Sequence, residues 1–124
     1  MDKVGSTMKA KFSSFGEIEI DKAHYQHDVV IEQGIVRKRM KKASKPYRAQ
    51  YGHTPLSVEE PIPWIGKSLY IGTGMYGSLP IMPEVYKEAD QRGVEVVADK
   101  TEAICRLLEE LQPENVNAVL HVTC

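Results

Sequence analysis

The sequence predicts a single α/β domain in which an antiparallel β meander precedes alternating strands and helices. In the first third, residues 15–21 alternate apolar and polar side chains with a period of two, and residues 28–32 are rich in β-branched residues, which are both typical of strands. The second half alternates short apolar segments with segments of helical period. This order predicts a sheet covered by at least two helices, with right-handed crossovers wherever neighbouring strands run parallel.

The meander is predicted from three apolar segments, with a tight turn between the last two. In residues 15–21 the apolar Ile18 and Ile20 alternate with acids. Residues 28–32 and 35–40 are the next two strands, and glycine in Gln33-Gly34 supplies the positive φ of a tight turn between them. We expect residues 1–10 to form a flexible segment and residues 11–124 to form the domain.

The second half contains three further strands and two helices. The first helix begins at Pro83, where proline suits the first turn, and ends before Gly93, which suits a left-handed cap. Thr101 is expected to cap the second helix, which Pro113 ends. The strands are predicted at residues 68–71, 94–97 and 116–122.

Composition excludes several classes of protein. The chain has 124 residues, 42% of them hydrophobic and 27% charged, which is close to globular averages and excludes wholesale disorder. No apolar run approaches the roughly 20 residues that span a bilayer, and the first residues lack the apolar core of a signal peptide. Two cysteines are too few for a disulfide scaffold. We therefore expect a cytoplasmic protein with no membrane contact.

The charges are segregated along the chain. Residues 37–48 hold seven bases and no acid, whereas the other nine bases accompany all 17 acids, so the rest of the chain has a net charge of −8. One interpretation is a solvated strand and turn whose bases face the acidic body. The other is a contact surface for an acidic partner or a nucleic acid, with Tyr47 and Tyr51 available to stack on unpaired bases.

A glycine motif follows the strand at residues 68–71. Residues 72–77 match G-x-G-x-x-G, and Asp99 closes the next strand, near the position of the ribose-binding acid in dinucleotide folds. Pro80 and Pro83 delay the next helix, so its amides cannot reach a pyrophosphate at the glycine turn. We interpret the motif as a sharp strand exit, with a small-anion site at the loop amides as the alternative.

Histidine and cysteine spacing gives no support for a metal site or a catalytic triad. His24 and His27 form H-x-x-H, and His121 and Cys124 form H-x-x-C, which together would supply four zinc ligands. Both pairs fall in predicted extended segments, where residues i and i+3 point to opposite faces. No nucleophile next to a base can be identified, and Cys105 is expected in the core. We expect no metal and no cofactor.

Four stretches resemble the MTH-type domain family of small, mostly uncharacterised proteins. They are residues 25–31, 51–57, 71–80 and 120–124. The resemblance implies a three-layer α/β fold with a central mixed sheet, similar to a rearranged Rossmann topology. It also implies no settled activity or cofactor; relatives of this family include a mitochondrial complex I assembly factor and an adipogenesis-associated protein. The family's recurrent positions fall here on Gly52, His53, Gly72, Gly74, His121 and Cys124.

Three functions follow as hypotheses. The leading one is a non-catalytic interaction or assembly factor with a protein partner, whose surface includes Arg37, Arg39 and Lys42. The second is a small-molecule or anion-binding protein, with or without enzymatic activity, at the loop of residues 72–77. The third is nucleic-acid binding through residues 37–48. The oligomeric state stays open, and the candidate ligand-binding residues are Gly72, Gly74, Tyr76, His53 and His121.

Overall fold

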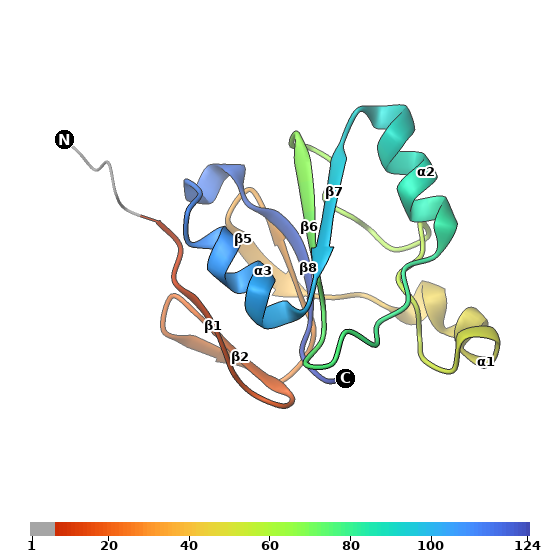
Figure 1. The fold of residues 1–124 in the computed structure, drawn as a ribbon, viewed down its shortest axis with the longest axis horizontal. Helices are drawn as coiled ribbons and strands as arrows, with labels where there is room; N and C mark the ends of the chain where they lie inside the picture. The colour runs from red at the N-terminus through yellow and green to blue at the C-terminus, as the bar shows by residue number, and fades with distance from the viewer. Residues whose placement is uncertain (1–6) are drawn as a thin grey trace.

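The computed structural model describes residues 7–124 and contains two β-sheets with helices packed against them (Figure 1). The small sheet consists of β1 (Ala10–Ser14), β2 (Glu17–Ile20) and β3 (Ala23–Tyr25). The large sheet consists of β4 (Val29–Glu32), β5 (Ile35–Lys38), β6 (Ser68–Thr73), β7 (Glu95–Asp99) and β8 (Asn117–His121). The helices are η1 (Lys42–Tyr47), α1 (Arg48–Tyr51), α2 (Pro83–Arg92), α3 (Thr101–Leu108) and η2 (Pro113–Asn115).

The large sheet is mixed, with strand order β5-β4-β8-β6-β7. β4 is antiparallel to both of its neighbours, β5 and β8. β6 lies between β8 and β7 and is parallel to both. The carboxyl ends of β6, β7 and β8 therefore meet at one edge, which is the edge where ligands usually bind in open α/β sheets.

Strand alternation divides the core into two layers on either side of the large sheet. Val29 and Ile31 face the layer that contains α3 and the small sheet. Val30, between them, faces the opposite layer, which contains α2 and the connection before β6. This period of two is the one that a pleated strand imposes on a sheet covered on both faces. The predicted three-layer α/β fold with a central mixed sheet is confirmed.

The N-terminal antiparallel meander is present, but its strands differ from those expected. β2 pairs with β1 and β3, whereas β4 and β5 form a hairpin in the large sheet. The sequence placed β2, β4 and β5 in one meander because each is strand-like by itself and nothing local reveals which strands pair. Met8 and Ala10 are buried in the core, so the packed structure begins before residue 11; residues 1–6 lie outside the described part.

The two main helices begin where predicted, but α3 ends at Leu108 rather than at Pro113, which begins η2. α2 begins at Pro83, and Gly93 caps its end with a φ of 70°. α3 begins at Thr101, but Thr101 does not cap it; Lys100 is the N-cap residue, with no side-chain cap bond. Cys105 lies on the buried face of α3, as predicted, and burial with two nearby acids raises the pKa of its thiol to about 12. In residues 7–124 no helix is long and apolar enough to cross a membrane.

Residues 41–51 differ most from the prediction. They form the short helices η1 and α1 rather than a strand and turn. In Figure 1 these two helices project at the lower right, away from both sheets. Ser57–Glu60, predicted as a helical turn, adopts a turn without helix.

Candidate functional site

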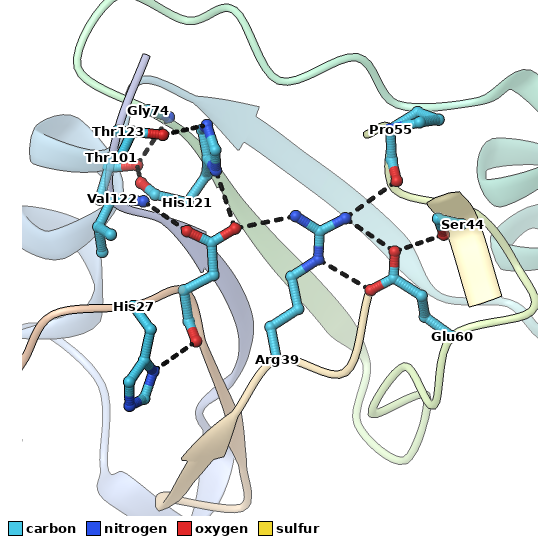
Figure 2. A network of polar contacts seen from close by, with 11 residues as sticks. His27, Arg39, Ser44, Pro55, Glu60, Gly74, Thr101, His121, Val122 and Thr123 are labelled. Atoms are coloured by element: carbon cyan, nitrogen blue, oxygen red, sulfur yellow. Dashed lines mark hydrogen bonds and ion pairs between the residues drawn. The ribbon is translucent and has the colours of Figure 1, made fainter. Parts of the chain in front are cut away.

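A buried cluster of charged and polar side chains lies where β4 begins and β8 ends (Figure 2). Its centre is Asp28, the residue before β4, which is 7% exposed. The Val122 amide donates to Asp28 Oδ1 at 2.9 Å. His121 Nδ1 and Arg39 Nη1 lie 2.8 and 2.9 Å from Asp28 Oδ2. Asp28 thus joins three segments that are far apart in the sequence.

Arg39 links Asp28 to a second buried carboxylate. Its guanidinium donates from Nε to Glu60 Oε1 at 2.8 Å and from Nη2 to Glu60 Oε2 at 2.7 Å. Nη2 also donates to the Pro55 carbonyl oxygen at 2.9 Å. The Ser44 hydroxyl donates to Glu60 Oε2 at 2.6 Å. Each nitrogen of the Arg39 guanidinium therefore donates to an acid or a carbonyl, as the planar geometry of this group allows.

The cluster keeps its charges because each is paired. Burial alone would raise the pKa of Asp28, but the bond and charge of His121, the Val122 amide and Arg39 outweigh burial and lower this pKa from 3.8 to about 2. Burial also opposes the charge on Arg39, yet Glu60 and Asp28 together raise its pKa above the usual value. Both shifts favour ionised partners in the folded state.

The cluster also places a carboxylate, an imidazole and a hydroxyl in series. Because Asp28 is ionised, its Oδ2 can only accept, so the proton of the 2.8 Å contact lies on His121 Nδ1. The Thr123 hydroxyl lies 3.1 Å from His121 Nε2. This order of groups is that of a catalytic triad. Here Arg39 pairs with Asp28 at one end of the series, and the Thr123 carbonyl oxygen accepts the Met75 amide at the other end. We therefore assign the series a structural role.

The predicted partner surface at Arg37, Arg39 and Lys42 needs a correction. Arg39 is only 3% exposed and its charge is balanced by Asp28 and Glu60, so it cannot contact a partner. Arg37 is half-buried and donates to the Pro61 carbonyl oxygen at 2.6 Å. Lys42 alone of the three is exposed. The sequence could not separate them because the two carboxylates that bury Arg39 lie 11 and 21 residues away.

The loop after β6 is closed by the end of the chain. The Met75 amide donates to the Thr123 carbonyl oxygen at 2.7 Å, and the Tyr76 and Ser78 amides donate to that of Cys124 at 2.9 and 3.0 Å. These three amides are therefore not available to an anion, which disfavours the alternative of a small-anion site at this loop. The next helix begins only at Pro83, so the loop does not lead into a helix N-terminus.

Gly72 and Gly74 allow this close packing. A Cβ on Gly72 would lie 2.8 Å from Thr101 Oγ1, and one on Gly74 would collide with the carbonyl group of Cys124. Gly74 also has a φ of 104°, which disfavours other residues. The Gly74 amide donates to Thr101 Oγ1 at 2.8 Å. Both glycines shape the strand exit, as the first interpretation of the motif predicted.

The candidate ligand-binding residues are not all brought together. A cavity of about 440 Å³ at the carboxyl ends of β6 and β7 is lined by Tyr76, but not by Gly72, Gly74, His53 or His121. His53 is exposed in the loop after α1, whereas His121 faces Asp28.

The histidines that would have bound zinc also have separate partners. His24 lies 3.0 Å from Glu17 in the small sheet, and His27 bonds to the Asp28 carbonyl oxygen. His121 is paired with Asp28. In residues 7–124 no group of three or more His, Cys, Asp or Glu side chains is placed to hold a metal ion.

The remaining bases form an exposed group on η1, α1 and the segment before them. Its members are Lys38, Lys41, Lys42, Lys45 and Arg48. In the part of the chain that the structure describes, none of the five forms an ion pair. Met40, among them, is 63% exposed. The expectation that these bases face the acidic body is not met for this group.

Comparison with solved structures places the chain in a family. A conserved hypothetical protein from Pyrococcus horikoshii, PH1505, is 33% identical, with 94% of this chain and 100% of that chain covered and a TM-score of 0.78. A Bordetella pertussis protein described as an Mth938-like domain is 18% identical over 98% of this chain and 89% of its own, with a TM-score of 0.61. The protein MT938 is 22% identical over 95% and 100%, with a TM-score of 0.54. The chain belongs to the MTH-type domain family.

These descriptions of MTH-type proteins name no activity, substrate or partner, which agrees with the expectation of an uncharacterised family. No protein-family model matches the sequence, and no curated protein matches it.

Five of the six recurrent positions of the MTH-type family, all except the exposed His53, have a structural role in this chain. Gly72 and Gly74 let α3 and the end of the chain approach β6. His121 holds Asp28, and Cys124 accepts two loop amides through its carbonyl oxygen. Gly52 caps α1 with a φ of 79°. The recurrent positions came from the family resemblance, whereas sequence reasoning missed Asp28, Arg39 and Glu60 as a unit, because no spacing relates residues 28, 39 and 60.

Proposed function

We propose that this MTH-type protein is a non-catalytic interaction protein that binds an acidic segment of a protein partner. The binding surface is the basic stripe, which we define as Lys42, Lys45 and Arg48. The observation that supports it is the exposure of these bases without any ion pair among the described residues. Bases that are solvated and unpaired are available to a partner's carboxylates at little desolvation cost.

The local helix geometry places the three bases on one side. η1 is a 3₁₀ helix, in which residues three apart lie one above the other. Lys42 and Lys45 therefore share a face, and Arg48 follows at the same spacing as α1 begins. The stripe is thus formed by a rigid backbone rather than by a flexible tail.

The opposite side of η1 is anchored to the body. The Ser44 side chain is buried, with its hydroxyl on Glu60, and the Tyr47 hydroxyl donates to Glu59 at 3.2 Å. These two residues are also three apart, so they occupy the face that the bases leave free. The anchoring fixes the orientation of the basic stripe before a partner arrives, which lowers the entropy cost of binding.

An acidic protein segment suits this surface better than a nucleic acid. Tyr47, which would stack on an unpaired base, is instead engaged with Glu59. The exposed Met40 offers an apolar contact next to the bases, which fits a peptide that mixes acids with an apolar side chain. The rest of the sequence is net negative, so an acidic partner is repelled from other faces and steered toward the basic stripe.

The proposal is tested by fluorescence anisotropy with a labelled peptide of alternating Glu and Leu. We expect the triple variant Lys42→Glu, Lys45→Glu and Arg48→Glu to weaken peptide binding at least about tenfold, which is about 1.4 kcal/mol. A control variant, Lys11→Glu, Lys67→Glu and Lys87→Glu, changes the net charge equally at exposed lysines elsewhere. It should leave binding within about twofold of wild type.

Three results would overturn the proposal. One is the absence of peptide binding to the wild type at low salt. Another is an equal loss in both triple variants, which would show that only net charge matters. The third is a clear preference for single-stranded DNA of the same charge, which would favour nucleic-acid binding.

A further inference from the structure

A second feature, independent of the basic stripe, is the cavity of about 440 Å³ beside the loop after β6. It lies at the carboxyl ends of the parallel strands β6 and β7, where Thr73 and Asp99 are the last residues. From its lining we propose that this cavity binds an uncharged nucleoside, a planar base joined to a sugar with vicinal hydroxyls. The cavity is open to solvent, and its volume lies within the range of about 300–1,000 Å³ that is usual for small-molecule sites.

Two tyrosine rings line the cavity and are unusually exposed. Tyr76 in the loop is 67% exposed and Tyr86 on α2 is 47% exposed. Leu79 and Ile81, which lie between the two tyrosines in the sequence, add an apolar surface to the lining. Exposed aromatic rings next to an apolar surface favour stacking with a planar heterocycle, because every base presents a π-face.

Polar groups at the other side of the cavity suit a sugar. Asp99 is exposed at the end of β7 and accepts the Lys100 amide at 2.7 Å through Oδ1, which leaves Oδ2 for a ligand. A carboxylate at the end of the strand that follows the crossover helix is where dinucleotide folds bind the ribose hydroxyls. Here β6, α2 and β7 form the same strand–helix–strand unit.

The surroundings disfavour a phosphate. The Met75, Tyr76 and Ser78 amides already donate to carbonyl oxygens of Thr123 and Cys124. The lining contains one exposed base, Lys100, and one exposed acid, Asp99, so it carries no net positive charge that would attract a phosphate. Glu102 in the first turn of α3 opposes an anion at that helix end. The site therefore has the features of the nucleoside half of a nucleotide site without those of the phosphate half.

NMR titration of the ¹⁵N-labelled protein with adenosine, AMP and adenine tests the inference. We expect adenosine to shift the amides of Tyr76, Asp99 and Lys100 saturably, with a Kd of about 1 mM or tighter. AMP should bind no better than adenosine. Tyr76→Ala should weaken adenosine at least about fivefold, and Tyr51→Ala, which alters a half-buried tyrosine outside the cavity, should not.

The sugar contact has its own test. Asp99→Asn should weaken adenosine severalfold and leave adenine unchanged, whereas Asp90→Asn on α2 should alter neither. Absence of saturable shifts with adenosine, tighter binding of AMP than of adenosine, or full binding by Tyr76→Ala would overturn the inference. None of these results affects the acidic-peptide test, because the basic stripe and the cavity share no residue.

Discussion

The bases of residues 37–48 lie in two different environments, because one of them is buried in the interior and others are exposed on the surface. Arg39 is buried between Asp28 and Glu60, whereas Lys42, only three residues later, is exposed and has no ion pair within residues 7–124. The difference does not come from the bases themselves but from what the fold brings beside them. Among the bases of this run, Arg39 is the one that the fold pairs with Asp28 and Glu60 in the described residues.

The comparison separates charges that hold the fold from charges that are available to a partner. Arg39 uses its planar fork for two carboxylates, which lysine cannot reproduce. The residues of the basic stripe are exposed and form no ion pair within residues 7–124, and an ion pair in solvent adds little to stability. Loss of the buried base and loss of an exposed base should therefore have very different consequences.

The largest expected effect is that of Arg39→Ala. Removal of the guanidinium leaves the buried carboxylates of Asp28 and Glu60 without their cation, so we expect a loss of about 3–5 kcal/mol in the free energy of unfolding. Urea denaturation followed by circular dichroism measures it. Lys42→Ala is the matched control and should change stability by less than about 0.5 kcal/mol.

Arg39→Lys tests whether the geometry of the guanidinium stabilises the fold in addition to its charge. It keeps the charge but loses the two-pronged contact with Glu60, so its stability should fall between those of wild type and Arg39→Ala. Equal stability of Arg39→Lys and wild type would show that charge alone, and not the fork, holds the cluster.

A second prediction concerns acid stability. The folded pKa of Asp28 is lowered from 3.8 to about 2, so its ionised form stabilises the fold at pH values above 3.8. This contribution, about 2 kcal/mol, is lost as the pH falls from about 4 through about 2, because the unfolded chain takes up the proton first. Urea denaturation at a series of pH values measures the loss.

Asp28→Asn isolates this contribution. The variant should be less stable than wild type at pH 7, since Arg39 and His121 lose a charged partner, but its stability should fall less steeply below pH 4. Identical acid slopes for Asp28→Asn and wild type would contradict the assignment of the low pKa to Asp28.

Much of the fold could be predicted because its signals are local. Pro83 and Gly93 delimit α2, and the β-branched residues Val29, Val30 and Ile31 mark a strand. Strand pairing could not be predicted, because β2 and β4 both have the local features of strands and only the complete fold decides which sheet each one joins. The short helices η1 and α1 were missed because Pro46 obscures helical signals, and 3₁₀ geometry has no apolar period of its own.

The candidate site was also predictable only in part, again where its signals are local. Gly72 and Gly74 were predicted as a strand exit because two prolines downstream exclude a helix at the loop. The contact of the loop amides with Cys124 was not predictable, since it joins residues almost fifty positions apart. Arg39 was assigned to the surface because sequence shows a run of charge but not the distant carboxylates that neutralise one member of it.

The smallest expected effect on stability is that of neutralising the exposed basic stripe, in contrast to the loss of the buried Arg39. Replacing Lys42, Lys45 and Arg48 together by Gln removes three neighbouring like charges that have no described ion pair. Repulsion between them disappears while no contact is lost, so we expect the free energy of unfolding to stay within about 0.5 kcal/mol of wild type. The difference should shrink further in 1 M salt, where the Debye length is only about 3 Å. Urea denaturation at low and high salt measures both. A loss comparable to that of Arg39→Ala would mean that the basic stripe holds the fold together and is not free for a partner.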